Sequence, residues 1–222
     1  MSDFLKRTPE PELMDERLQA EAYAAADFSE PHQHCVNTCA QRLGELTGKV
    51  LDLGCGPGDV LSRYAKANLT AQFVGVDGAS VMLALAKAVM EELGLSQRVA
   101  LEQHYLPSSA LSGRYFDAVV SNSLLHHLND PQVLWKTIKT SGRSGARVFI
   151  MDLMRPATKA QLEALVHKYA SDAPPVLFRD FRASLHAAYR LEEVKAQLAT
   201  AGLDLKVEAV SDRHLIAWGT LP

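Results

Sequence analysis

The 222-residue chain has an ordinary globular composition, with 47% hydrophobic and 22% charged residues, which fits one domain with a substantial core. Its formal net charge of −3 provides no basic field to hold a polyanion, so a nucleic-acid substrate is not expected. We find no signal peptide and no apolar run of transmembrane length. We therefore expect a soluble, cytoplasmic protein without a membrane span.

Residues 1–47 are predicted to be helical. Apolar residues recur at helical intervals from Glu12 to Phe28 and again from Pro31 to Leu46. Within the second stretch, Cys35 and Cys39 stand four residues apart, a spacing that places both thiols on one side of a helix.

The three cysteines leave two interpretations open. An odd number argues against a disulfide framework, and free cysteines usually pack as small hydrophobic groups. Together with His32 and His34, however, Cys35 and Cys39 could bind a metal or a thiophilic substrate such as arsenic. Cys55 lies inside a glycine-rich turn, where we expect it to pack beneath a ligand.

Strand-like apolar runs alternate with helical ones along the rest of the chain, which is typical of a parallel sheet covered on both faces. The predicted strands are Lys49 to Gly54, Gln72 to Asp77, Val99 to His104, Phe116 to Asn122, Arg147 to Leu153, Leu205 to Ser211 and His214 to Gly219. Only Asp212-Arg213 separates the last two, so they must pair antiparallel. A helical insert over residues 156–202, with a break at Pro174-Pro175, precedes them.

The turn after the first strand is rich in glycine, at Gly54, Gly56 and Gly58. Glycine accepts positive φ and has no Cβ, so such a turn lets a ligand lie against the backbone. The dinucleotide fingerprint requires a glycine where Asp59 stands, and that carboxylate would repel a pyrophosphate. An NAD-dependent oxidoreductase is therefore disfavoured, and no P-loop sequence follows.

Asp77 ends the second predicted strand, 19 residues beyond Gly58. A carboxylate at this place lies beside the glycine turn and can accept both hydroxyls of a ribose. It could also cap the helix expected to start near Ala79. The two roles do not exclude each other.

Three segments together carry a family resemblance: Leu51 to Gly58, Gly75 to Asp77 and Phe116 to Leu128. They are similar to the successive motifs of class I S-adenosylmethionine-dependent methyltransferases, in the small-molecule branch that includes ubiquinone and menaquinone methyltransferases. The similarity covers about residues 48–155. It implies an α/β fold with a Rossmann-like, doubly wound sheet of six parallel strands and one antiparallel strand, which the closing hairpin reproduces.

The resemblance also implies a single methyltransferase domain over residues 1–222. Its parts would be an N-terminal helical cap (1–47), a cofactor-binding core (48–155), the helical insert (156–202) and a C-terminal hairpin (203–222).

The cofactor implied by the resemblance is S-adenosylmethionine, with S-adenosylhomocysteine as the product. The contacts it implies are Asp52, Gly54, Gly56, Gly58, Asp77, Gly78, Asn122 and Ser123. Relatives often have Gly-Asp after the third strand to contact the adenine, whereas this chain has His104-Tyr105. In their place, the backbone amide of Leu106 is a candidate adenine contact; the alternative is a strand end that packs on the next helix.

His126 is the candidate general base, since a neutral imidazole suits proton transfer near pH 7. Paired histidines also occur here in the family without a catalytic role. Asp152 is equally a base or a cap for the next turn. Candidate substrate contacts are Tyr23, Phe28, His127, Arg155, Arg179 and Tyr189. The arginines, with Arg182, would bind a carboxylate or phosphate, or else lie in solvent.

These features predict methyl transfer to a small organic acceptor by in-line displacement. A non-catalytic S-adenosylmethionine-binding protein and an arsenic methyltransferase are the alternatives. The prediction includes no metal ion and assigns neither the methylated atom nor an oligomeric state.

Overall fold

The computed structural model, which describes residues 4–10 and 17–222, contains a seven-stranded sheet in the order β3-β2-β1-β4-β5-β7-β6. The strands are β1 (Lys49–Leu53), β2 (Gln72–Asp77), β3 (Val99–Gln103), β4 (Phe116–Asn122), β5 (Gly142–Leu153), β6 (Lys206–Ala209) and β7 (His214–Thr220). β7 runs antiparallel to both β5 and β6, and the other pairs are parallel. The predicted arrangement is confirmed.

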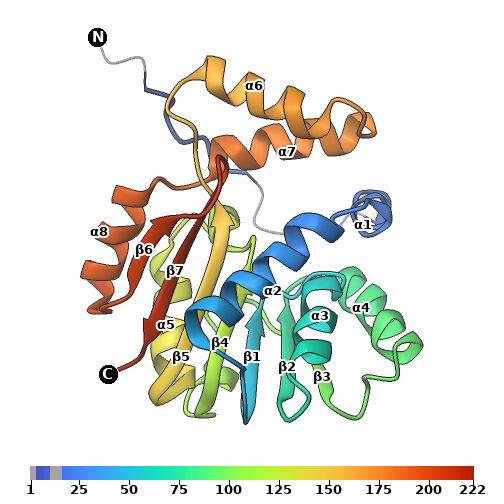
Figure 1. Cartoon of the computed structure of the whole chain (residues 1–222), viewed down its shortest axis with the longest axis vertical. Coiled ribbons are helices and arrows are strands. Elements are labelled where there is room, and N and C mark those ends of the chain that lie inside the picture. Colours follow the sequence, from blue (N-terminus) through green and yellow to red (C-terminus); the bar gives the residue numbers. More distant parts are fainter. Residues whose placement is uncertain (1–3, 11–16) are drawn as a thin grey trace.

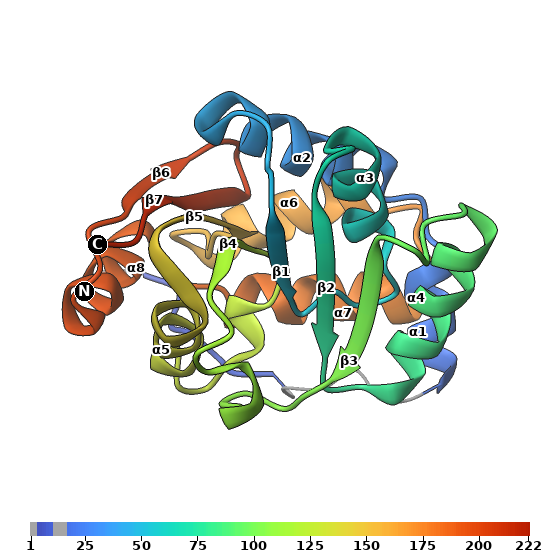
Figure 2. The same ribbon diagram turned by 90° about the horizontal axis from the view of Figure 1, so that it is seen from below.

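Helices cover both faces of this sheet, with α2 and α3 on one face and α5 and α8 on the other (Figures 1 and 2). They are α1 (Arg17–Ala25), α2 (Ser29–Leu43), α3 (Asp59–Ala67), α4 (Ser80–Glu92), α5 (Gln132–Ser141), α6 (Lys159–Ala170), α7 (Pro175–Ala187) and α8 (Leu191–Ala201), with 3-10 turns η1 (Ser109–Leu111) and η2 (Leu125–His127). Among the described residues, no helix is both long and apolar enough to cross a bilayer.

Side chains of successive strand residues point to opposite faces of the sheet and pack into two separate hydrophobic cores. In β1, Val50 packs with Cys35 and Tyr64 on the α2–α3 side, whereas the next residue, Leu51, packs with Trp135 on the α5–α8 side. This follows from the two-residue period of a strand. Because both faces are buried, the strands are continuous apolar runs rather than alternating ones, and that is why they could be found in the sequence.

Within the helical insert, α6 and α7 form a further layer above the carboxyl ends of the strands (Figure 1), whereas α8 packs on the sheet with α5. The predicted break at Pro174-Pro175 is the start of α7, with Pro175 as the first helical residue, a position where proline's missing N–H costs nothing. α6 begins with a capping box in which the Thr158 hydroxyl accepts from the Gln161 amide at 3.2 Å.

The predicted and observed boundaries differ most at the N-terminal helices and at the start of β5. Residues 11–16 of the first predicted helix lie outside the described residues, and α2 already begins at Ser29, because proline is tolerated in a first helical turn. β5 begins at Gly142 rather than Arg147, since a register shift lets Phe116 pair with Gly142 before Ala118 pairs with Arg147.

Replacing Trp135 with alanine tests the α5–α8 core. Trp135 is fully buried, and its indole N–H donates to the Gln197 side chain at 3.1 Å. Its loss is expected to lower the free energy of unfolding by about 3–5 kcal/mol. Leu69→Ala, at a side chain that is 71% exposed, is the control in urea denaturation and should change it by less than about 0.5 kcal/mol. Equal effects would contradict this description of the core.

Candidate functional site

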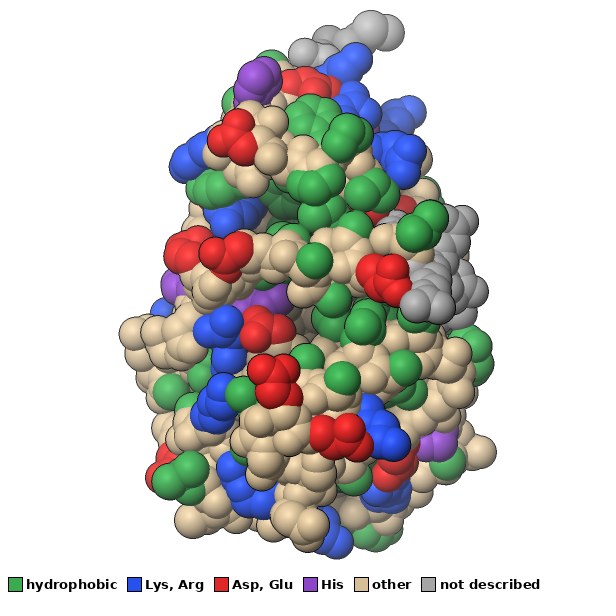
Figure 3. All heavy atoms as spheres, turned by 90° about the vertical axis from the view of Figure 1, so that its right-hand side faces the viewer, with side chains coloured by type: hydrophobic (Ala, Val, Ile, Leu, Met, Phe, Trp, Pro, Cys, Tyr) green, Lys and Arg blue, Asp and Glu red, His purple; other side chains and the backbone are tan. Residues whose placement is uncertain are grey.

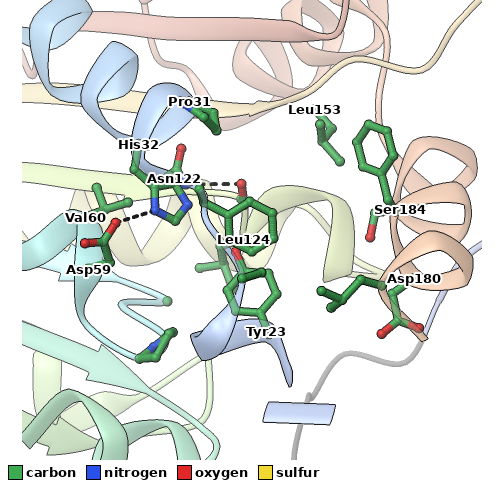
Figure 4. A pocket seen from close by; sticks show the side chains of 18 of the residues that line it. Tyr23, Pro31, His32, Asp59, Val60, Asn122, Leu124, Leu153, Asp180 and Ser184 are labelled. Atoms are coloured by element: carbon green, nitrogen blue, oxygen red, sulfur yellow. Dashed lines mark hydrogen bonds and ion pairs between the residues drawn. The ribbon is translucent and has the colours of Figure 1, made fainter. Parts of the chain in front are cut away.

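A cavity of about 730 Å³ lies at the carboxyl ends of the strands, where open α/β sheets bind ligands. In Figure 4, the His32–Asp59 pair stands on one side of it, and Asp180 and Ser184 of α7 stand on the other. The predicted site residues that line it are Tyr23, Phe28, Asp52, Gly54, Gly56, Asp77, Gly78, Asn122, Ser123, His126 and His127. Gly58, Leu106, Arg155, Arg179 and Tyr189 do not line it.

The glycine turn brings backbone to the cavity wall. All three glycines have positive φ, between +52° and +87°, a region open to glycine at no steric cost. A Cβ on Gly56 would meet no atom within 4 Å and would project into open space. One on Gly58 would lie 3.0 Å from Ala86 and Met90 of α4. Gly58 therefore permits close helix packing, whereas Gly56 leaves room for a ligand.

Asp77 joins the end of β2 to this turn. One carboxylate oxygen accepts the Gly56 amide at 2.9 Å, and the other accepts the Ala79 amide at 2.8 Å. Burial raises the pKa of Asp77, and the amides that donate to it act in the opposite direction. Ala79, not Asp77, is the residue that precedes the first turn of α4, so Asp77 supports the turn while facing the cavity.

Asp52 is a second cavity carboxylate, and it is 2% exposed. Burial, followed by the nearby Asp77 charge, raises the pKa of Asp52 to about 7. A bound cation next to Asp52 would relieve both causes, because it would stabilise the ionised form. The site is thus suited to a ligand that carries positive charge near β1.

Asn122 and Ser123 end β4 at the cavity. Ser123 has φ +57°, and its amide donates to the Met151 carbonyl at 2.9 Å. The Asn122 side-chain amide donates to the Ser123 hydroxyl at 3.2 Å. A non-glycine residue at positive φ is uncommon, and here the backbone bend turns both polar side chains to the cavity wall.

The region after β3 lies away from the cavity. His104 contacts the Glu102 carboxylate at 3.1 Å, Tyr105 is exposed, and Leu106 packs against the α5–α8 core. The predicted adenine contact at Leu106 is not supported by this placement. Instead, Gly78 lines the cavity, and its carbonyl accepts the Gln103 side-chain amide at 2.9 Å.

His126 is held on both sides by carboxylates. Its Nδ1 lies 2.5 Å from Asp152, and its Nε2 lies 3.3 Å from Glu10. Burial alone would lower the pKa of this imidazole, but Asp152 and then Glu10 raise it above its usual value. Asp152 also accepts the amides of Leu125 and Leu153 at 2.7 Å each. It therefore positions both η2 and the His126 ring.

Tyr23 and Phe28 form an aromatic wall, with ring centroids 4.9 Å apart. The adjacent His32 bonds to Asp59 at 2.7 Å, and this bond, more than Arg63, lowers the pKa of Asp59 to about 2. The pair joins α2 to the start of α3. We did not predict this contact, since no pattern in the sequence relates two residues 27 positions apart.

The predicted substrate contacts at Arg155, Arg179 and Tyr189 are corrected by their placement. Arg155 is buried and pairs with Glu193, while the Arg179 side chain is 76% exposed. The Tyr189 hydroxyl donates to the Leu128 carbonyl at 2.9 Å. Arg182, the fourth candidate, pairs with Glu163. Arg155 and Arg182 thus pair with acidic residues, Arg179 extends into solvent, and none of the three arginines lines the cavity.

The cavity wall is acidic. Its described carboxylate residues are Asp27, Glu30, Asp52, Asp59, Asp77, Asp172 and Asp180. Among the described lining residues, Arg213 is the one permanent cation, and it stacks 3.4 Å above the Tyr169 ring beside Asp212. Figure 3 shows acidic side chains around the hollow on this face. Such a wall disfavours an anionic ligand.

Cys35 and Cys39 lie in the α2–α3 core rather than at the cavity. Burial raises the pKa of the Cys39 thiol to about 12 and that of Cys35 further. Thiolates are the species that bind metals and thiophilic groups. The packing interpretation therefore holds for both residues.

Comparison with known proteins identifies relatives by sequence. The model of a methyltransferase domain matches residues 50–145. The ubiquinone biosynthesis O-methyltransferase of Pseudomonas aeruginosa (strain LESB58) is 31% identical over 175 residues, which are 77% of this chain and 71% of that protein. The enzyme with the same name from Acinetobacter baumannii (strain ACICU) is 26% identical over 176 residues, which are 77% and 70%.

Solved structures share the fold at lower identity. An S-adenosylmethionine-dependent methyltransferase from Aquifex aeolicus superposes with a TM-score of 0.70 at 18% identity, covering 92% of this chain and 98% of that one. The plantazolicin methyltransferase BpumL, solved with S-adenosylhomocysteine, gives 0.71 at 14% identity, covering 94% and 91%.

Asp52→Asn is expected to stabilise the ligand-free protein at pH 8. Because the folded-state pKa of about 7 exceeds the unfolded value of 3.8, the folded protein binds the extra proton. The contribution of Asp52 to stability therefore falls as pH rises from about 4 to about 7. The variant should gain about 1–3 kcal/mol at pH 8 and much less at pH 4. Urea denaturation at both pH values, with exposed Asp204→Asn as control, measures this. An equal gain in unfolding free energy at pH 4 and pH 8 would contradict the raised pKa of Asp52.

Proposed function

The chain belongs to the class I S-adenosylmethionine-dependent methyltransferases, and we propose that it transfers the methyl group to a hydroxyl oxygen of a small, uncharged organic acceptor. The chemical class of the acceptor is inferred from the cavity wall, which combines aromatic and aliphatic side chains with carboxylates. The hydroxyl is supported by the relatives, which are named as O-methyltransferases.

The residues around the glycine turn fit the cofactor. The open space above Gly56 admits a molecule against the backbone, and Asp77 lies beside it to accept ribose hydroxyls. Asp52, whose pKa is raised by burial and by the nearby Asp77 charge, suits the positively charged methionine end. Gly78 and Met82 line the same end of the cavity, where we propose that the adenine lies. Asn122 and Ser123 would contact the methionine part.

When bound, S-adenosylmethionine supplies a methyl group on a sulfonium; the acceptor oxygen bonds to that carbon as the carbon–sulfur bond breaks, and the electron pair remains on sulfur. The protein contributes by positioning the two molecules and excluding water. Tyr23, Phe28 and the α7 residues Leu177 and Phe181 line the cavity and would enclose the acceptor. We propose that Glu10, His126 and His127 activate its hydroxyl group.

The wall argues for an uncharged acceptor. The cavity has seven described acidic lining residues, of which Asp52 and Asp77 are assigned to the cofactor, and Arg213 is the one permanent cation among the described lining residues, so a carboxylate or phosphate on the acceptor would meet a mainly acidic wall. Apolar side chains, namely Leu124, Leu153 and Phe181, line the cavity as well. Their surface favours an apolar or aromatic body, so a hydroxylated ring or chain without an acidic group fits best.

The alternatives receive less support. A binding protein without catalysis would not need the Asp152–His126–Glu10 arrangement at the acceptor side of the cavity. An arsenic methyltransferase would need accessible thiolates, whereas Cys35 and Cys39 are buried. Methyl transfer from labelled S-adenosylmethionine to a panel of neutral phenols and alcohols tests the proposal. If none is methylated while the cofactor binds, the non-catalytic alternative is preferred.

Asp77→Ala is expected to weaken S-adenosylhomocysteine binding by roughly 10- to 100-fold, because hydrogen bonds to an ionised group contribute about 1.5–3 kcal/mol. Isothermal titration measures this. Asp117→Ala is a matched control, since Asp117 also accepts a backbone amide, that of Lys49, but at the opposite end of the sheet. Unchanged affinity in Asp77→Ala would refute the ribose role, and no binding by the unmodified protein would refute the cofactor assignment.

His126→Ala is expected to lower kcat by roughly 100-fold or more and to leave S-adenosylhomocysteine affinity unchanged, because His126 is assigned to the acceptor. His167→Ala, which removes an exposed histidine of α6, should leave kcat unchanged. If His126→Ala retains full kcat on an accepted phenol, His126 has no part in activation.

A further inference from the structure

The N-terminal segment brings a carboxylate to the two histidines of η2. The Glu10 Oε1 atom lies 3.3 Å from His126 Nε2 and 3.4 Å from His127 Nδ1. All three atoms lie within 4.8 Å of one another. Two imidazole nitrogens and one carboxylate oxygen thus converge on one point, and each is an atom that can ligate a transition metal.

These separations match the edges of a metal coordination sphere. Ligand atoms about 2.0–2.2 Å from a tetrahedral Zn²⁺ ion stand roughly 3.3–3.6 Å from one another. Both distances from Glu10 to the histidines fall in that range. The remaining edge, between the two histidine nitrogens, is no longer than 4.8 Å.

The converging Glu10 oxygen also lacks a hydrogen bond. Glu10 is only 10% exposed, and its buried Oε1 has no hydrogen-bond partner, whereas its other oxygen accepts the Ser184 hydroxyl at 3.2 Å. A buried polar atom without a partner carries a free-energy cost. A cation between Glu10 and the histidines would remove this cost.

The surroundings of His126 are those of a metal ligand. Asp152 lies 2.5 Å from Nδ1, so this nitrogen faces a carboxylate and Nε2 is the nitrogen that faces Glu10. Metal-binding histidines almost always donate their second ring N–H to a carboxylate, a backbone carbonyl or water. Asp152 is itself fixed by the amides of Leu125 and Leu153.

The segment that carries Glu10 is fastened at several points. The Arg7 side chain donates to the Ala187 carbonyl at 2.6 Å and to the carbonyls of His126 and Leu128 at 3.0 and 3.1 Å. The Thr8 amide donates to the His186 carbonyl at 3.1 Å. These bonds hold Glu10 against η2, which is what a preformed ligand set requires.

We propose that Glu10, His126 and His127 bind one divalent transition-metal ion of the Zn²⁺ type, and that its open coordination position takes the acceptor hydroxyl. Both histidines line the cavity, so the ion is reachable by the acceptor. Two histidines and a glutamate with one open position form a known catalytic zinc set. This replaces the expectation of no metal with a site that the sequence did not indicate.

The role of the ion in methyl transfer rests on the proposed function, whereas the binding of the ion to Glu10 and the histidines does not depend on it. An ion on the hydroxyl oxygen lowers the pKa of that group. The O–H bond then breaks with the proton passing to water. The oxygen lone pair forms the bond to the methyl carbon, and the carbon–sulfur electron pair remains on sulfur, so charge and atoms balance.

Metal binding is tested directly with chelator-treated, full-length protein titrated with Zn²⁺ by calorimetry, and with Co²⁺ followed by its visible absorption. We expect one ion per chain. Glu10→Gln and His127→Ala should each weaken binding at least 10-fold, and Asp152→Asn should weaken it by about 10- to 100-fold. His167→Ala and Glu30→Gln are controls that keep the affinity. Loss of the site in the controls, or no stoichiometric binding, would overturn the proposal in favour of a proton-linked Glu10–His126 pair.

S-adenosylhomocysteine titration of the same variants separates this proposal from the proposed function. Glu10→Gln and His127→Ala should bind it as the unmodified protein does, which also shows that they fold. If Zn²⁺ binds as expected but chelation leaves methyl transfer to a neutral phenol unchanged, the acceptor role of the ion is refuted while the methyltransferase function stands.

Discussion

The contact between Asp77 and the Gly56 amide is the constraint on which the site depends. It joins the end of β2 to the turn after β1, so the two strand ends that face the cavity keep one relative position. The contact exists because β1 and β2 run parallel and adjacent, and because positive φ at Gly54 and Gly56 turns the amide toward the carboxylate. A side chain on Gly56 would project into the open space that a ligand needs.

The cavity wall is acidic because the arginines in and beside the helical insert that covers it do not face the cavity. Arg155, just before the helical insert, pairs with Glu193 of α8, and Arg182 of α7 pairs with Glu163 of α6. The carboxylates of the strand ends and of α2 and α3 are left to face the cavity. The wall therefore favours a positively charged cofactor and, as we propose, a cation at Glu10 and the histidines.

The fold, and the place of Gly54, Gly56 and Asp77 at the cavity, were predictable because both rest on local signals. Buried parallel strands are apolar runs, and the glycine turn and Asp77 stand at fixed places in those runs. The acceptor half was not predictable in the same way. Arg155, Arg179 and Tyr189 were plausible from residue type alone, but the packing of α6, α7 and α8 directs them elsewhere.

The sequence by itself determined the succession of strands along the chain and the antiparallel hairpin, because chain connectivity and short-range periodicity carry that information, and its motifs carried the resemblance to the family. Tertiary structure alone decided that Glu10 meets His126 and His127, and that His32 meets Asp59. These residues are separated by 116, 117 and 27 positions, and no periodicity relates them. Their contacts arise only when the N-terminal segment and helices close over the strand ends, since burial then selects which polar groups must face one another.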